Sequence, residues 1–515
     1  MPISVMAKSS SLSALTNAGS ISDRCLVLVF LDGGNDGINT LIPIDQYDVL
    51  MRDGSGGDSK PLRRPDLMIP EENILKLNGL SNTGLHSKME KFQNLFNDDK
   101  LGFVRNVGYP NPNKSHFRST DIWNSASASD EFIYSGWFGR YLSNNHSSYP
   151  EGYPNNEYPD PLALTIGRTA SNTCQGPIVN MGMSIKNLNS FVDIKEGEGE
   201  VPDTPYGHEL QYIRTASKLT NDYFERLEEA AGYGGNSKIE YPELNLAQQL
   251  KIVAQLIAGG LKSKIFVVRL GGFDTHDNQV DSGDTETGRH ANLMEELSES
   301  VSAFQEDIMD RGLEERVLTM TYSEFGRRVK ENGSQGTDHG SAAPTLLFGP
   351  PLKGSGIIGE WPSLDNLNRR GNMYNSIDFR SIYQTILKDW LCGDSDYIDK
   401  ALLGNEYDAL GLGFGCNDLE TVDYNDLFNF HNPIYANSVN VVNLNLRIKQ
   451  THKINIRIYD ILGRHISTVF EGELNRGEHT FPLSHNQGGK ISSGQYFYRI
   501  GISGGQALSK SFVVR

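Results

Sequence analysis

A continuous apolar run, Cys25–Leu31, followed directly by the polar segment DGGNDG, restricts the fold of this chain more than any other feature. Polar residues do not alternate with apolar ones along the run, so a strand built from it buries both of its faces. Such strands are typical of parallel sheets with helices on either side. The run therefore predicts a buried parallel strand with the polar segment at its carboxyl end. Residues 101–107 repeat this pattern more weakly.

Helical and strand patterns alternate further along the chain. A helix is predicted over 244–262, and it leads into an apolar strand at 265–270. A second helix, 290–311, leads into a strand at 316–322, and another strand follows at 344–349. This order predicts an α/β fold in which a mostly parallel sheet is sandwiched by helices.

The C-terminal residues 436–515 differ from the rest of the chain in charge and in pattern. They contain ten Lys/Arg and four Asp/Glu, a net charge of +6, whereas the whole chain of 515 residues carries −17. Ile454, Ile456 and Ile458 alternate with polar residues, which predicts a small antiparallel β-sandwich. We therefore expect three segments: a polar N-terminal segment at 1–20, the α/β domain at 21–435 and the sandwich at 436–515.

Composition excludes several classes of protein. The net charge of −17 opposes general binding of nucleic acid, which requires cations at the phosphates. The longest apolar run is seven residues, whereas a membrane-spanning helix needs about 20. The four cysteines do not have the spacing of a zinc site, and the sequence does not decide whether Cys392 and Cys416 form a disulfide. The first residues, MPISVMAKSSS, do not have the pattern of a signal peptide.

Polar side chains that are able to carry chemistry follow four of the predicted strands. They are Asp32, Asn35 and Asp36 after the first; Ser115 and His116 after the second; Asp274, His276 and Asp277 after the third; and Ser323, Glu324, Arg327, Asp338 and His339 after the fourth. Because sites in open parallel sheets form beyond the carboxyl ends of the strands, we expect these groups to meet. Carboxylates and imidazoles are ligands that suit zinc, manganese or iron. The sequence therefore predicts a metal or polar catalytic site.

Each of these groups also has a structural interpretation. Asp36 is alternatively a helix cap, and the Asp–His pairs alternatively satisfy buried backbone amides. Ser115 begins a predicted helix, where it is either an N-cap or a nucleophile activated by neighbouring cations. Arg327 either clamps a tetrahedral anion or is a solvated side chain, and His290 and Glu324 are weaker candidates. LDGGNDG does not fit a dinucleotide loop, because its spacing is not GxGxxG and its aspartates would repel a pyrophosphate.

Four long motifs carry a resemblance to a known family. They are VFLDGGNDGINTLIP, NVGYPNPNKSHFRSTDIWNSA, GGFDTHDNQ and TYSEFGRRVKENGSQGTDHGSAAPTLLFG. Over about residues 20–415 the chain resembles the bacterial domain of unknown function 1501, which is similar to the alkaline phosphatase and sulfatase superfamily. The resemblance implies a hydrolase fold that binds two divalent metal ions, with zinc favoured, and acts on phosphate or sulfate esters.

The same resemblance implies roles for individual residues. Asp338 and His339 match one Asp–His metal pair, Asp274 and His276 match the ligands of the other ion, and Ser115 takes the place of the nucleophile. The superfamily's first aspartate matches Asp32, whereas the family's own pattern favours Asp36. Residues 350–390 lack the superfamily's late histidine, for which His290, upstream, is the substitute; His116 is a further candidate. The sulfatase cysteine motif is also missing, which favours phosphatase-like chemistry.

The C-terminal segment resembles the type A sorting domain of the Bacteroidetes type IX secretion system. The matching features are INIRIYDILGRHI, SSGQYFYRI and the terminal KSFVVR. The resemblance implies export by that machinery and a secreted or cell-surface protein. The sequence as a whole thus predicts an exported metal-dependent hydrolase of phosphate-type or sulfate esters that uses a metal-activated serine. The alternative is a catalytically inactive secreted or cell-surface binding protein on the same scaffold.

Overall fold

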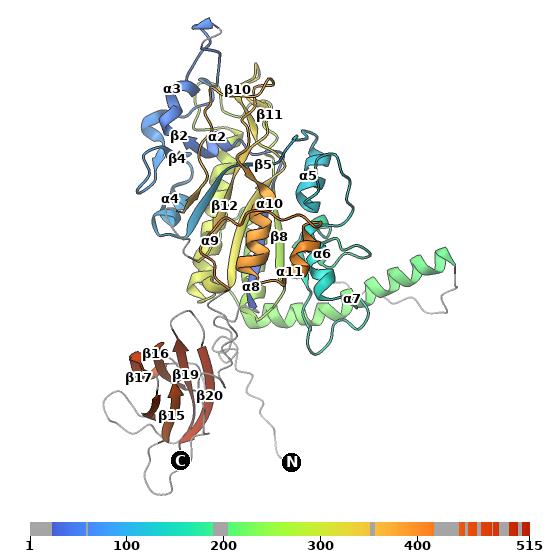
Figure 1. Ribbon diagram of the computed structural model, residues 1–515, viewed down its shortest axis with the longest axis vertical. Coiled ribbons are helices and arrows are strands. Elements are labelled where there is room, and N and C mark those ends of the chain that lie inside the picture. Colours follow the sequence, from blue (N-terminus) through green and yellow to red (C-terminus); the bar gives the residue numbers. More distant parts are fainter. Residues whose placement is uncertain are drawn as a thin grey trace. The chain divides into compact units, whose positions relative to one another are not determined.

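Two compact units make up the chain in the computed structural model (Figure 1), one of them formed by residues 24–414. The structure describes residues 23–416, apart from 58–59, 189–203 and 351–355, and six strands between residues 442 and 514. The predicted N-terminal segment 1–20 and the predicted boundary at 435/436 lie outside the described residues. Among the described residues, no helix combines the length and the apolar character needed to cross a bilayer.

The central sheet of the larger unit forms around β1 (Cys25–Asp32), the strand predicted from the apolar run. It lies between β8 (Ile265–Gly271) and β9 (Val317–Ser323) and runs parallel to both. The sheet has the order β13-β5-β12-β9-β1-β8-β6-β7, with β14 also paired to β5. The other bounds are β5 (Leu101–Gly108), β6 (Ala163–Ile166), β7 (Met183–Ile185), β12 (Ala343–Phe348), β13 (Ile357–Ile358) and β14 (Ile377–Asp378).

One strand departs from the parallel arrangement predicted for 344–349. Strand β12 is antiparallel to both β9 and β5. Between β9 and β12 the chain forms only a hairpin of β10 (Arg327–Glu331) and β11 (Thr337–His339). A parallel partner needs a long crossover, usually a helix, and this segment supplies none, so the chain returns in the opposite direction. The sheet is therefore mixed but mostly parallel.

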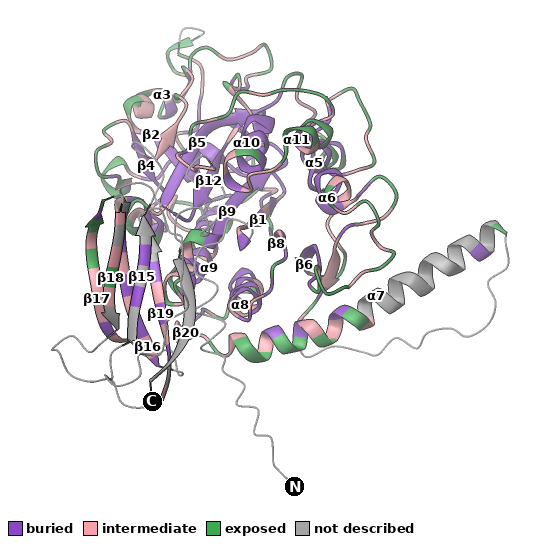
Figure 2. Cartoon of the chain, turned by 60° about the horizontal axis from the view of Figure 1, so that its bottom comes forward, coloured by how far each residue is buried: buried purple, intermediate pink, exposed green. Residues whose placement is uncertain are grey.

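Helices cover both faces of this sheet, as predicted. On one face, α4 (Glu90–Asn97), α7 (Pro205–Gly234), α8 (Asn245–Ala258) and α9 (Arg289–Asp310) pack against Val27 and Val29 of β1. On the other face, α5 (His116–Ser125), α6 (Trp137–Asn145), α10 (Phe379–Thr385) and α11 (Ser395–Ala401) pack against Leu26 and Leu28. Figure 2 shows the central strands buried between these layers. Alternate side chains of one strand thus enter two separate cores, which explains its continuous apolar sequence.

Short elements extend the sheet edge around the loop that follows β1. They are α2 (Gly37–Thr40), α3 (Tyr47–Leu50) and a small sheet of β2 (Leu41–Pro43), β4 (Thr83–Leu85) and β3 (Leu75–Lys76). Cys25 and Cys174 are free and buried, whereas Cys392 and Cys416 are disulfide-bonded.

The C-terminal strands form a separate small β-sandwich. One sheet pairs β15 (Val442–Ile448) with β18 (Gly477–Leu483), and the other has the order β17 (His465–Leu474), β16 (His452–Asp460), β19 (Gly494–Ile502), β20 (Ala507–Val514). All pairings are antiparallel. Ile454, Ile456 and Ile458 are buried in one core with residues from both sheets, as their alternation predicted.

Candidate functional site

Three loops at one edge of the central sheet bring together His116, Asp274, His276 and His339, which we call the histidine–aspartate cluster. Asp274 and His276 follow β8, His339 ends β11, and His116 is the first residue of α5. The ring of Phe325 packs against those of His339 and His116, with centroids 4.2 and 5.1 Å apart. The cluster is partly exposed to solvent.

The side chains of the cluster converge on the carboxylate of Asp274. Its Oδ1 lies 3.3 Å from Nε2 of His276 and 3.3 Å from Nε2 of His339, and its Oδ2 lies 3.5 Å from Nε2 of His116. The Nε2 atoms of His276 and His339 are 2.8 Å apart. One ligand atom each of His116, Asp274 and His339 lies within 4.8 Å of the other two, and a carboxylate with two imidazole nitrogens is a donor set that zinc accepts. The residues present therefore fit a divalent metal ion.

The second nitrogen of each ring, Nδ1, faces an oxygen outside the cluster. His339 Nδ1 is 2.8 Å from the carbonyl oxygen of Lys114, and His116 Nδ1 is hydrogen-bonded to Glu324. His276 Nδ1 lies 3.7 Å from Oδ1 of Asp338. In His339 and His116, an Nδ1–H donated to such an oxygen leaves Nε2 unprotonated, and this is the arrangement that orients metal-binding histidines.

Three carboxylates that the sequence predicted as metal ligands lie outside the cluster: Asp338, Asp32 and Asp36. Asp338 lies behind His276 and 3.4 Å from Nη1 of Arg328. Asp32 ends β1 and forms an ion pair with Arg269. Asp338 contacts His276 Nδ1 and Arg328, and Asp32 contacts Arg269. Neither carboxylate lies where the Nε2 atoms meet.

Glu324 is buried beneath His116. Burial raises the pKa of its carboxyl to about 7; the hydrogen bond from His116 opposes this shift, and the neighbouring Asp32 adds to it. The sequence singled out Glu324 only as a weaker candidate, yet its contact with His116 makes it part of the site's framework.

Asp36 lies beneath the site in a buried network. Both of its oxygens accept from Nη1 of Arg64, at 2.8 and 2.7 Å, and Oδ2 also accepts from Nε2 of Gln279 at 2.6 Å. Burial favours the neutral acid, but the charge and hydrogen bonds of Arg64, aided by His290 and Gln279, hold the pKa of Asp36 below its ordinary value. With both oxygens engaged, Asp36 is not part of the cluster.

Gln279 connects this network to the two loops that carry the cluster. Its Oε1 accepts from Oγ1 of Thr275 at 3.0 Å and from Oγ1 of Thr337 at 2.9 Å. Thr275 lies between Asp274 and His276, and Thr337 is two residues before His339. The carboxamide therefore fixes the two loops relative to one another. No local sequence pattern identified Gln279 or Arg64, because their partners are distant along the chain.

Arg327 is neither an anion clamp nor a solvated side chain, the two alternatives that the sequence left open. It is buried, and its Nε and Nη1 donate to the carbonyls of Gly34 and Thr337 at 2.8 and 2.9 Å. Its Nη2 donates to the carbonyls of Gly33 and Phe273 and to Oδ1 of Asp274, at 2.6, 2.8 and 2.8 Å. Arg327 therefore anchors Asp274 and is not available to clamp an anion.

The glycines of DGGNDG allow the loop after β1 to approach the site. Gly33 has φ +121°, and a Cβ on it would lie 2.4 Å from the backbone nitrogen of Asp274. A Cβ on Gly34 would lie 2.4 Å from the ring of Phe325. Side chains at these positions would separate the loop from the cluster.

Ser115 and His290 differ in exposure and in their distance from the cluster. Ser115 is exposed at the start of α5, and its hydroxyl does not cap the helix, so it remains available beside His116. His290 is buried on α9 against His86, with ring centroids 5.7 Å apart, and does not join the cluster. Among the described residues, His116 supplies the imidazole for which the sequence offered His290.

Lys114 is a further residue that the sequence did not single out. Its Nζ donates to the carbonyl of His339 at 3.0 Å and to Oδ1 of Asn372 at 2.7 Å. Burial lowers the pKa of its ammonium group to about 8. Its position in the sequence, directly before Ser115 and His116, is the feature that could have identified Lys114 as part of the site.

Residues 228–398 match the model of a family described as "Protein of unknown function (DUF1501)", which agrees with the resemblance seen in the motifs. A comparison with curated proteins finds no match.

Several solved structures resemble the chain at low similarity. The lipoteichoic acid synthase LtaP from Listeria monocytogenes is 12% identical over 83% of each chain, with a TM-score of 0.31. The PsFucS1 sulfatase from Pseudoalteromonas sp. is 13% identical over 94% of this chain and 88% of its own, with a TM-score of 0.29. PorU from Porphyromonas gingivalis is 21% identical over 17% of this chain and 9% of its own, with a TM-score of 0.14. These values assign no role to any residue of this chain.

Proposed function

We propose that the histidine–aspartate cluster binds a divalent metal ion and that the protein is a metal-dependent hydrolase of phosphate-type or sulfate esters. The observation that supports this most is the orientation of the three imidazoles. Their Nε2 atoms face Asp274, and each Nδ1 faces a carbonyl or carboxylate oxygen. A bound ion would supply positive charge that polarises the ester and stabilises a developing oxyanion.

Residues of the chain would bind the ion, position the loops and supply the nucleophile. His116, Asp274 and His339 would hold the ion, with His276 beside them, while Arg327 and Gln279 keep the loops in register. The Ser115 hydroxyl attacks the phosphorus or sulfur atom and loses its proton, and the ester's alcohol leaves with a proton. Water then cleaves the serine ester and restores the hydroxyl. The described residues contain one group of three metal-binding side chains, His116, Asp274 and His339, so a second ion rests on the family resemblance.

The first prediction concerns Ser115. Ser115→Ala is expected to abolish turnover of an aryl phosphate while metal content stays at the wild-type level, because the hydroxyl is the nucleophile and not a ligand. Its effect on stability should be within about 0.5 kcal/mol, since the side chain is exposed and does not cap α5. Ser55→Ala, in an exposed loop, is the matched control. Wild-type turnover in Ser115→Ala would reject the serine as nucleophile.

The second prediction concerns Gln279. Gln279→Leu is expected to weaken zinc binding by about 10–100-fold, because it frees the loops that carry His276 and His339. Calorimetric titration of the metal-free protein with zinc measures the change in affinity. Gln255→Leu removes a different, partly buried contact, a hydrogen bond to the carbonyl of Ala231, and should leave zinc affinity unchanged. Equal zinc affinity in the Gln279 variant and wild type would show that the network does not position the site.

We also propose that residues 436–515 direct export through the type IX secretion machinery, on the strength of the motifs INIRIYDILGRHI, SSGQYFYRI and KSFVVR. The third prediction follows. A protein ending at residue 435 should keep its hydrolytic activity, because the cluster lies wholly within the unit 24–414, but should remain inside a host that has this machinery. Fractionation of such cells measures export. Secretion of the truncated protein would contradict the proposal.

A further inference from the structure

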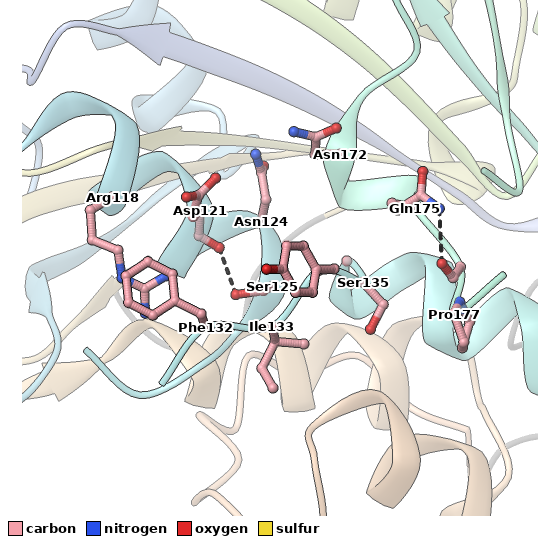
Figure 3. A pocket seen from close by; sticks show the side chains of 13 residues that line it. Arg118, Asp121, Asn124, Ser125, Phe132, Ile133, Ser135, Asn172, Gln175 and Pro177 are labelled. Atoms are coloured by element: carbon pink, nitrogen blue, oxygen red, sulfur yellow. Dashed lines mark hydrogen bonds between the residues drawn. The ribbon is translucent and has the colours of Figure 1, made fainter. Parts of the chain in front are cut away.

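A pocket lies along α5 and shares no residue with the histidine–aspartate cluster (Figure 3). Its volume is about 400 Å³, within the range of small-molecule sites. Its walls come from α5, the loop around residues 132–136 and the segment 172–177.

Planar polar side chains line the pocket with unused hydrogen-bonding capacity. Asn124 accepts from Thr173 at 2.8 Å through Oδ1, and Gln175 donates to the carbonyl of Gly176 at 2.9 Å through Nε2. Within the described part of the chain, the Asn124 Nδ2 and the Gln175 Oε1 have no partner, nor do the side chains of Asp121 and Asn172. The pocket therefore presents both donors and acceptors.

Large apolar side chains surround this polar lining and face solvent. Phe132 is 70% exposed and Tyr134 is 96% exposed, and both line the pocket. Phe117 and Ile178, each adjacent in sequence to a lining residue, are also strongly exposed. These four are the most exposed large apolar side chains among the described residues. Contiguous exposed apolar groups next to polar ones mark binding surfaces.

Arg118 adds two unpaired buried donors to these walls. Its Nη2 donates to the carbonyl of Ala128 at 3.0 Å, but its buried Nε and Nη1 have no partner among the described residues. Its guanidinium lies 4.1 Å from the centroid of the Phe132 ring, and the residue is 7% exposed. Unpaired buried donors are costly, so an oxygen-rich ligand that reaches beside Phe132 would gain by pairing them.

We propose that this pocket binds one residue of a neutral carbohydrate. A pyranose has hydroxyls at its edge, each both donor and acceptor, and an apolar face of C–H groups. The amides, carboxylate and guanidinium match the edge, and the rings of Phe132 and Tyr134 match the face. A phosphate ligand is disfavoured, because the carboxylate of Asp121 lines the pocket and would repel it. This binding does not depend on the proposed hydrolysis.

The test uses a panel of methyl glycosides of glucose, galactose, mannose, xylose, fucose and N-acetylglucosamine, with saturation-transfer NMR on the full chain. At least one glycoside is expected to bind, and Phe132→Ala and Asn172→Ala should each weaken that binding at least about tenfold. Tyr374→Ala removes an exposed aromatic residue outside the pocket and should not change it. Thermal unfolding verifies that the variants remain folded. Binding of no glycoside, or undiminished binding in Phe132→Ala, would overturn the proposal.

Discussion

Asp274→Ala is expected to lower the affinity of the protein for zinc by more than about 100-fold. The reason is geometric, since the Nε2 atoms of His116, His276 and His339 all face this carboxylate. Loss of this carboxylate removes the one anionic donor of the cluster and leaves only imidazole nitrogens. Changes outside the ligand sphere of a metal typically cost 10–100-fold, so loss of a ligand should cost more. Calorimetric titration of the metal-free protein with zinc measures the effect.

Asp277→Ala is the matched control for this prediction. Asp277 lies three residues away in the same loop, is exposed and pairs with Arg289 at 2.9 Å. Its replacement should leave zinc affinity at the wild-type value. Equal losses in the two variants would mean that the loop, and not the Asp274 carboxylate, determines binding.

Arg64→Met is expected to destabilise the larger unit by about 3–5 kcal/mol. Arg64 is 0% exposed and Asp36 is 1% exposed, so the variant leaves a buried carboxylate without its cation. Urea unfolding followed by tryptophan fluorescence measures the loss. All four tryptophans lie between residues 123 and 390, so the signal reports the unit 24–414 alone.

A double variant distinguishes charge from packing in this prediction. Arg64→Met combined with Asp36→Leu removes both charges, and it should be more stable than Arg64→Met alone, because no unpaired charge remains buried. If the double variant is as unstable as the sum of the single ones, the ion pair is not the source of the effect.

The fold was largely predictable because its signals are periodic and local. The apolar run Cys25–Leu31 enters two cores with alternate side chains, and a strand of this kind needs no long-range information to be identified. The direction of β12 was not predictable from its own residues. It depends on the hairpin of β10 and β11, which occupies the place where a crossover helix would be required.

The candidate site was predictable only in part. Strand ends indicated which loops meet, and the structure brings Asp274, His276 and His339 together with His116. The separate roles of Asp36 and Arg327 depend on contacts across the chain. Asp36 turns inward to Arg64, and Arg327 reaches the carbonyls of Gly33 and Gly34, about 290 residues earlier. Spacing along the sequence carries no signal of such pairs.

Anomalous X-ray diffraction from crystals of the protein grown with zinc tests whether the histidine–aspartate cluster binds a metal ion. Data collected on either side of the zinc absorption edge locate the ion without reference to activity. We predict an ion about 2.0–2.2 Å from Nε2 of His116 and His339 and from the carboxylate of Asp274. An ion bound elsewhere, or no anomalous peak among these residues, would contradict this prediction.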